Sequence, residues 1–404
     1  MTAGPEPLGK PVAHALLRLC AAPESGHGDC LAQLGPDDWS TLVRRAAELR
    51  VLPLVAQSLS QFEKAGPIPG EAAALIEQLQ RDFAFMVLRR SKGIARAHAI
   101  LSEAGLEPVF LKGAALAFDV YPSSMLRPSR DADILLDGDE SAAAQHALLA
   151  SGQFARHPGV PYAAECRHHH FPLLHGETGM AVEVHHALLN EGGWQGEARL
   201  IQKLLGETHE VGVLSEEIRV PSPMANILHL AMHAGIASYL DNGPLALSDL
   251  HFLMRSSGID PETALDQAGQ MGLGNAFAIL TALADRHGAV WVTDGLRQRC
   301  AGARVHLAAA EDAVLPTPQD LDDNKLARRV DRRMRKAGVF GPVAMALRPD
   351  PKSLAIAAGV EEHSARRWMA YPAWLAGKVR TYFRLHRQRD LARDRAFRDW
   401  LKSG

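Results

Sequence analysis

Apolar residues recur at mixed three- and four-residue spacing through most of the first hundred positions, which is the pattern of amphipathic helices. The spacing predicts helices over 12–22, 39–61 and 71–102, and breaks that contain proline and glycine separate them. We therefore expect an N-terminal helical region over residues 1–104.

The pattern changes after residue 104. Short apolar runs at 108–111, 131–136 and 180–186 predict strands, with helix-like segments and turns between them. Strands and helices in this order predict a small mixed α/β core over residues 105–192. The expected fold class is α+β, in which a small mixed-sheet core is embedded in a mainly helical protein.

Helical periodicity returns after this core. We expect a helical accessory domain over 193–310, followed by a linker and a basic C-terminal helical region over 311–404. In residues 364–404 basic side chains outnumber acidic ones, and aromatic residues lie between them. This region is either a surface for an anionic partner or an amphipathic helix whose charges are solvated. The arginine-rich segment 328–336 leaves the same two alternatives open.

Composition and charge narrow the class of protein. The 404 residues include 44 Lys+Arg and 46 Asp+Glu, and 47% are hydrophobic, which excludes a mainly disordered chain and a protein that coats nucleic acid through bulk charge. The four cysteines form no Cys-x-x-Cys pair, so neither a disulfide framework nor a zinc ribbon is expected. Residues 220–240 are too polar for a membrane span, and no signal peptide precedes the first helix. We therefore expect a cytoplasmic protein without a transmembrane segment.

Two aspartates at the start of a predicted strand are the first candidate for chemistry. Side chains alternate along a strand, so Asp131 and Asp133 project to one face while Ala132 and Ile134 project to the other. Two neighbouring carboxylates repel each other unless a cation lies between them, and a divalent ion with oxygen ligands suits this arrangement. A solvated strand edge is the alternative interpretation.

Two further segments add to this pattern. Lys112 and Gly113 stand between a predicted strand and a helix, where a glycine lets the backbone approach an anion and the lysine adds positive charge. Glu183 and His185 share the face of their strand that the neighbouring valines leave free. If that strand lies beside the one with the aspartates, three carboxylates converge and can hold two Mg²⁺ ions for phosphoryl or nucleotidyl transfer.

The ordered set of these segments resembles the uncharacterised nucleotidyltransferase family of the DNA polymerase β superfamily. Its parts are Leu111-Lys112-Gly113, Arg127, Asp131-x-Asp133 and Glu183-x-His185. The resemblance is strongest over residues 105–190. It implies that Asp131, Asp133 and Glu183 are the catalytic metal ligands, with Glu183 as third carboxylate or base. It also implies that Lys112, Gly113 and Arg127 meet the triphosphate, and we expect His185 to contact the nucleotide.

The resemblance implies an enzyme that moves a nucleoside monophosphate from a nucleoside triphosphate (NTP) to an unidentified acceptor, with Mg²⁺ or Mn²⁺ as cofactor and release of pyrophosphate. The acceptor can be a small molecule, a peptide or protein, or RNA. Ala114 departs from the usual Gly-Ser or Gly-Gly turn of the superfamily, so a catalytically weak or inactive nucleotide- or RNA-binding protein is an alternative. A toxin-like nucleotidyltransferase that acts on tRNA fits the same residues.

Histidines offer a different chemistry. His168 and His170 share a face of a predicted strand, and with His185 and His186 they form either an imidazole metal site or the polar lining of a cleft. His229 and His233 lie one helical turn apart, and Asp249 is a candidate partner for one of them.

Overall fold

The computed structural model describes residues 8–62, 68–158, 167–190, 194–317, 319–321, 323–324, 351–361, 363–377 and 391–404. The chain divides into two compact units. One is formed by residues 8–315 and 398–404, and the other by the described part of 316–397.

The first unit contains three successive groups of elements. The N-terminal helices are α1 (Lys10–Ala21), α2 (Gly28–Leu31), α3 (Pro36–Glu48), α4 (Leu52–Phe62) and α5 (Gly70–Glu103). The sheet region comprises β1 (Val109–Leu111), α6 (Lys112–Asp119), the 3₁₀ turn η1 (Ser124–Leu126), β2 (Asp131–Leu135), α7 (Gly138–Ala150), β3 (Phe154–Arg156), β4 (Leu173–His175), β5 (Ala181–His185), α8 (Glu197–Gly206), β6 (Thr208–Val213) and β7 (Glu216–Pro221). The following helices are α9 (Pro223–Ala231), the π-helical η2 (Met232–Ala237), α10 (Leu245–Ser257), α11 (Pro261–Gln270), α12 (Gly274–Arg286), α13 (Asp294–Arg299), η3 (Ala301–His306) and α14 (Leu307–Val314).

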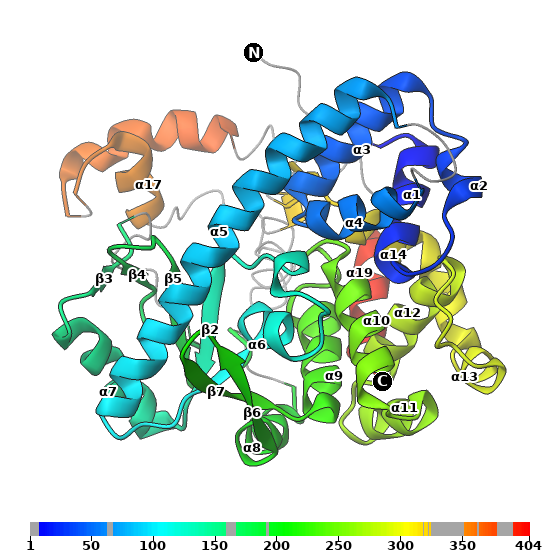
Figure 1. Ribbon diagram of the computed structural model, residues 1–404. Helices are drawn as coiled ribbons and strands as arrows, with labels where there is room; N and C mark the ends of the chain where they lie inside the picture. The colour runs from blue at the N-terminus through cyan, green and yellow to red at the C-terminus, as the bar shows by residue number, and fades with distance from the viewer. Residues whose placement is uncertain are drawn as a thin grey trace. The chain divides into compact units, whose positions relative to one another are not determined.

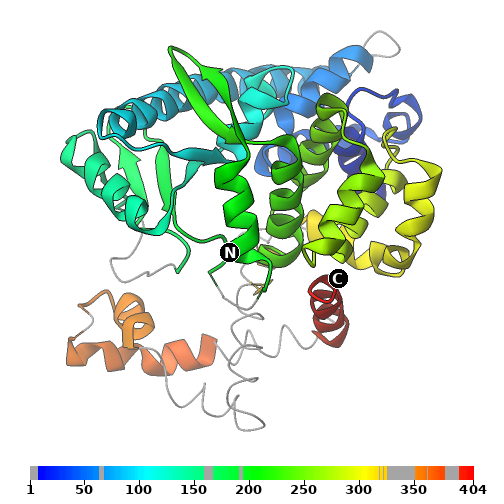
Figure 2. The same ribbon diagram turned by 90° about the horizontal axis from the view of Figure 1, so that it is seen from below.

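The described part of the second unit contains α17 (Pro351–Ala358) and η5 (Ala365–Ala370), and α19 (Leu391–Leu401) crosses the boundary between the units. Within the first unit, α9, α10 and α12 pack side by side (Figures 1 and 2). The basic segments 328–336 and 378–390 lie outside the described residues.

The first unit contains a seven-stranded sheet with the order β3-β4-β5-β2-β1-β7-β6, which lies below α5 in the view of Figure 1. The sheet is mixed, because β2 runs parallel to β5 but antiparallel to β1. The predicted α+β class, with a mixed sheet in a mainly helical protein, is confirmed. The sheet also extends past residue 192, because β7 pairs with β1, so the predicted helical region 193–310 contains a β-hairpin after α8. Charged residues in β6 and β7 hide these strands from a search for apolar runs.

One face of the sheet is buried against α5 and α7. Ala132 and Ile134 of β2 and Val182 and Val184 of β5 enter this core, as the alternation along each strand predicts. Burial of each such valine or isoleucine side chain contributes roughly 1.5–3 kcal/mol. A slip of one residue in either strand would place carboxylates in the core, so packing fixes the direction in which Asp133 points.

The predicted helix over 39–61 is interrupted in the structure. Arg50, between α3 and α4, has a φ of 64° in the left-handed region that favours glycine. Its N–H donates to Ala47 O (3.0 Å) and the N–H of Val51 donates to Ala46 O (2.8 Å), the bonds of a Schellman C-cap. Pro53, in the first turn of α4, favours the break, because a proline has no backbone N–H to donate to the preceding turn and is tolerated only at the start of a helix.

Cys20, Cys30 and Cys300 are buried and unpaired, and Cys166 lies outside the described residues. In the part of the chain that the structure describes, no helix is both long and apolar enough to cross a membrane.

His287, at the end of α12, makes stability depend on pH. Burial lowers its pKa to about 4, although Glu311 Oε1, 3.0 Å from Nε2, opposes the shift. An unfolded histidine has a pKa near 6.5, so the unfolded chain binds more protons between about pH 6.5 and 4. The stability that neutral His287 contributes, up to about 3 kcal/mol, is therefore present above pH 6.5 and lost as the pH falls to 4.

We predict that His287→Gln, which cannot titrate, reduces the loss of unfolding free energy between pH 7 and 4.5, as measured by urea denaturation. His146→Gln, at an exposed position, is the control and should keep the wild-type loss. An unchanged pH dependence in His287→Gln would contradict the assignment.

Candidate active site

The pairing of β2 with β5 brings the acidic residues together. Asp133 is directly opposite Glu183 across the two parallel strands, and Asp131 lies two residues earlier on the same face of β2. On its other side β2 pairs with β1, where Leu111 is opposite Asp133. Lys112 follows Leu111 immediately, so three strands deliver a cation and three carboxylates to one place.

Asp133 is buried and its charge is compensated. Its Oδ1 accepts hydrogen bonds from Lys112 Nζ at 2.6 Å and from His185 Nε2 at 2.8 Å. Burial by itself would raise the pKa of Asp133, but Lys112 and His185 outweigh it and hold the pKa well below the usual aspartate value. Lys112 in turn has a raised pKa, because Asp133 outweighs the effect of burial. Asp133 is therefore a carboxylate in the folded protein.

His185 also lies near Glu183 on its own strand. The Oε2 atom of Glu183 lies 3.6 Å from Nε2 of His185 and 3.6 Å from Nε2 of His169. Burial alone would lower the pKa of His185, but Asp133 and Glu183 raise it. Burial alone would raise the pKa of Glu183. The interaction with His185 is the largest of those that lower this pKa below the ordinary glutamate value.

Asp131 has a different environment from Asp133. It has no hydrogen bond or ion pair with any residue that the structure describes, and its strand position is half-buried. Burial, followed by the negative charge of Asp133, raises the pKa of Asp131 to about 6, while Lys112 and Arg50 act in the opposite direction. Of the three carboxylates, Asp131 is thus the one whose negative charge is least compensated by nearby cations.

The donors of Asp133, Glu183 and His185 lie within 4.8 Å of one another, close enough to share one ion. The two carboxylates of this set are ligands that suit Mg²⁺ or Mn²⁺, whereas Nε2 of His185 would have to give up its hydrogen bond to Asp133 to bind an ion. The donor set therefore fits the cofactor expected from the sequence. Asp131 lies outside this set of three, on the same face of β2.

The turn between β1 and α6 has an unusual backbone. Lys112 has a φ of 51°, a left-handed conformation that is rare for a residue with a side chain and that persists where the surroundings enforce it. A Cβ on Gly113 would lie 2.8 Å from Cβ of Ser129 and 3.1 Å from Nη1 of Arg127. Gly113 is thus required for packing of the segment that leads into β2, whether or not a phosphate approaches its backbone.

Arg127 binds a carboxylate of the protein itself. Its Nε and Nη2 donate to Oδ1 (2.6 Å) and Oδ2 (2.9 Å) of Asp249 in α10. The hydroxyl of Tyr121 donates to the same Oδ1 at 2.7 Å. The three side chains are buried, so this network fixes α10 to the segment before β2. Asp249, a candidate partner of His229 or His233 in the sequence, binds Arg127 and Tyr121 instead.

The histidines form two groups beside the carboxylates. The rings of His168 and His169 lie 5.2 Å and 5.1 Å from that of His185, measured between centroids. His170 instead contacts Ser141 Oγ at 2.8 Å, and its ring is tilted against that of His186, with centroids 5.0 Å apart. The neighbour of Glu183 is thus His169, which the sequence pattern did not single out. An isolated β-bridge pairs His169 with His185 and so places His169 beside Glu183. The run of three histidines contains no signal for this bridge.

His229 and His233 also lie near the site. Burial lowers the pKa of His229 to about 3, and the positive charge of Lys112 acts in the same direction. Burial, followed by Lys112, likewise lowers the pKa of His233. The two histidines come from α9 and the π-helical η2, and π-helical turns often occur at functional sites.

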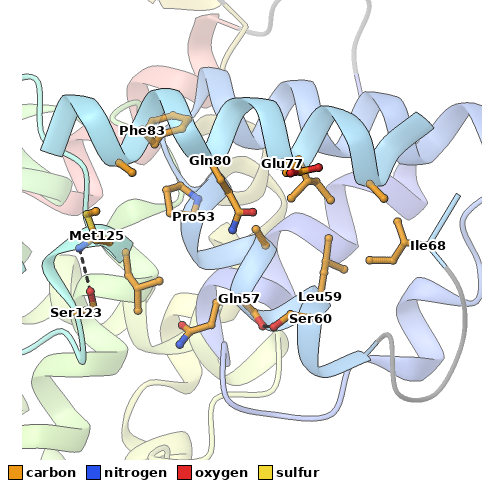
Figure 3. Close-up of a pocket in the computed structure, with 15 residues that line it drawn as sticks. Pro53, Gln57, Leu59, Ser60, Ile68, Glu77, Gln80, Phe83, Ser123 and Met125 are labelled. Atoms are coloured by element: carbon orange, nitrogen blue, oxygen red, sulfur yellow. Dashed lines mark hydrogen bonds between the residues drawn. The ribbon is translucent and has the colours of Figure 1, made fainter. Parts of the chain in front are cut away.

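A separate pocket of about 630 Å³ lies between α4, α5 and η1 (Figure 3). Its lining includes Pro53, Phe83 and Met125, and it contains no lysine or arginine. None of the sequence-predicted site residues lines it. Because its one charged residue is the acidic Glu77, the pocket does not suit a phosphate.

A mixed sheet that carries opposed carboxylates on two parallel strands, beside a strand–lysine–glycine–helix turn, is of the nucleotidyltransferase type. The family model described as "Uncharacterised nucleotidyltransferase" matches residues 35–288, more than half of the chain. The chain belongs to this family, and the resemblance seen in the sequence is confirmed. No curated protein and no solved structure matches the chain.

We predict that Arg127→Met lowers the unfolding free energy by about 3–5 kcal/mol, because it leaves the carboxylate of Asp249 buried without its cation. Adding Asp249→Leu should recover most of this loss. Denaturant unfolding of both variants measures the effect. The control is Arg81→Met, in an exposed ion pair with Glu77, which should cost less than about 1 kcal/mol. A stable Arg127→Met with weakened NTP binding would instead favour direct contact with phosphate.

Proposed function

We propose that this protein is a metal-dependent nucleotidyltransferase that moves a nucleoside monophosphate from an NTP to an acceptor, with release of pyrophosphate. The observation that carries the proposal is the placement of Asp133 opposite Glu183 on parallel strands, with Asp131 on the same face. Membership of the nucleotidyltransferase family supports the reaction class.

The proposed reaction is an in-line displacement. An acceptor hydroxyl or phosphate oxygen attacks the α-phosphorus, the bond from that phosphorus to the bridging oxygen breaks, and pyrophosphate leaves. In this proposal Glu183 takes the acceptor proton, and Lys112 and His185 keep the neighbouring Asp133 ionised. Positioning and charge stabilisation supply most of the acceleration, so these residues do little covalent chemistry themselves.

We assign Asp131, Asp133 and Glu183 as metal ligands, with His185 beside the nucleotide and hydrogen-bonded to Asp133. Asp133 and Glu183 lie within reach of one ion, and Asp131 is on the same face of β2. When bound there, Mg²⁺ or Mn²⁺ would neutralise charge on the phosphates and lower the pKa of the attacking group. In the absence of an ion Lys112 balances Asp133, and its hydrogen bond keeps the carboxylate directed into the site. Gly113 would bring the start of α6 close to the phosphates.

The Lys112–Asp133 bond also favours a second candidate function. A carboxylate already neutralised by a lysine and a histidine has less need of an ion, which suits a protein that binds a nucleotide without turning it over. Tight NTP binding without pyrophosphate release would support this second function. A cytoplasmic location, and an anionic partner at the basic C-terminal region, stay predictions.

The decisive experiment measures pyrophosphate release from each of the four ribonucleoside triphosphates, with Mg²⁺ or Mn²⁺ and a cell extract as the source of acceptor. We predict that Asp133→Asn and Glu183→Gln each lower release by about 100-fold or more, because each removes charge from the proposed metal site. Labelled nucleotide transferred to a component of the extract would then identify the acceptor.

The matched control is Glu177→Gln in the turn before β5, where an exposed glutamate pairs with Lys92 away from the cluster. This variant should retain wild-type release. Release that persists unchanged in Asp133→Asn and Glu183→Gln would refute the proposed active site.

A further inference from the structure

The cations expected to meet the triphosphate are engaged within the protein. Lys112 Nζ is bonded to Asp133, and the guanidinium of Arg127 is bonded to Asp249. Ala114 supplies no hydroxyl. A triphosphate placed beside these carboxylates needs positive charge from elsewhere, because phosphates and carboxylates repel each other.

Arg50 and Arg90 interact electrostatically with Asp131, and both also interact with Arg130. Arg50 stands between α3 and α4, Arg90 is in α5, and Arg130 immediately precedes β2. Burial, and then the charges of Arg127 and Arg130, lower the pKa of Arg50 to about 10, while Asp131 acts in the opposite direction. Burial also lowers the pKa of Arg90, where Asp131 opposes the shift and Arg130 adds to it. Arg50, Arg90 and Arg130 are called the arginine cluster below.

The arginine cluster has no anionic partner of its own. Among the residues that the structure describes, none accepts a hydrogen bond from, or forms an ion pair with, the side chain of any of its members. The Nη1 atom of Arg90 is buried without any acceptor, and a buried guanidinium N–H normally has one. Asp131 is the carboxylate that acts on Arg50 and Arg90, and one carboxylate does not balance the three arginines, which leaves excess positive charge for an anionic ligand.

The backbone around the cluster is built to hold these side chains in place. Glycine is the usual residue at the left-handed position of a Schellman cap, yet Arg50 occupies it with a φ of 64°. Such strain often marks functional sites. In α5, a Cβ on Gly93 would lie 2.9 Å from both Met180 Sδ and Thr178 Oγ1, so this glycine lets the helix approach the start of β5. Arg90, about one turn earlier in α5, is thereby brought near the start of β2, where Asp131 lies.

We propose that Arg50, Arg90 and Arg130 bind the β- and γ-phosphates of the NTP, and the pyrophosphate that leaves. The N-terminal helices would then complete the nucleotide site of the sheet. Planar guanidinium groups suit this ligand, because each can donate two parallel hydrogen bonds to phosphate oxygens. The inference rests on the proposed function for the identity of the ligand, but the binding of polyphosphate can be tested without turnover.

The test is calorimetric titration of the full chain with inorganic tripolyphosphate and Mg²⁺. We expect Arg50→Gly, Arg90→Ala and Arg130→Ala each to weaken binding about tenfold or more, the effect of one charged hydrogen-bonding group. Arg50→Gly is the sharpest variant, because glycine is favoured at this backbone position and should preserve or increase stability. Binding should weaken with added salt.

Two variants serve as controls. Leu214→Gly makes the same backbone change at an exposed residue with a φ of 58° in the turn between β6 and β7, and should leave binding unchanged. Arg81→Ala removes an exposed arginine from α5 and should also leave it unchanged. Wild-type affinity in all three cluster variants, or no binding of tripolyphosphate by the wild-type protein, would overturn the inference.

The outcome separates this inference from the proposed function. Asp133→Asn should abolish pyrophosphate release yet still bind tripolyphosphate through the arginine cluster. In a turnover assay the cluster variants should mainly raise KM for the NTP. Arginine-dependent binding without pyrophosphate release would uphold the cluster and refute the transferase, whereas turnover with unchanged KM in the cluster variants would refute the cluster alone.

Discussion

The close approach of like charges on β2 and β5 is the constraint on which the rest of the site depends. Asp133 and Glu183 are paired across parallel strands, and Asp131 is on the same face. Such an arrangement is unfavourable unless cations compensate it. Lys112 does so from the turn after β1, where its backbone has a positive φ, and His185 does so from the end of β5.

Burial of the apolar side chains on the other face of the same strands offsets the free-energy cost of bringing these charges together. Ala132, Ile134, Val182 and Val184 are fully buried against the helices on the opposite face, and their packing cannot be kept if the strands shift. The register that satisfies the core is therefore the register that opposes the carboxylates. Hydrophobic packing, rather than attraction between site residues, holds the charges together.

Much of this site could be predicted from alternation within single strands. The shared face of Asp131 and Asp133, and that of Glu183 and His185, follow from a period of two residues. The hairpin β6–β7 could not be found in the same way, because its strands carry charges on both faces. The break in the predicted helix 39–61 had a local signal in Pro53, but the left-handed conformation of Arg50 had none.

Partners that are far apart in sequence were beyond local patterns. Arg127 and Asp249 are 122 residues apart, and no periodicity in either segment indicates their pairing. The same holds for His169, which faces Glu183 because of one bridge to β5. In each case the tertiary fold determines which of several similar side chains becomes the partner of the carboxylate.

The ion pair between Arg127 and Asp249 also changes which arginines are expected to bind phosphate. An arginine four residues before Asp131 looks like a phosphate ligand in the sequence, but a buried bidentate bond to Asp249 makes its release costly. Arginines without carboxylate partners lose no ion pair when a phosphate binds. The helical region 35–104 lies inside the family match and contributes Arg50 and Arg90. We therefore regard it as part of the nucleotide site rather than as a separate accessory domain.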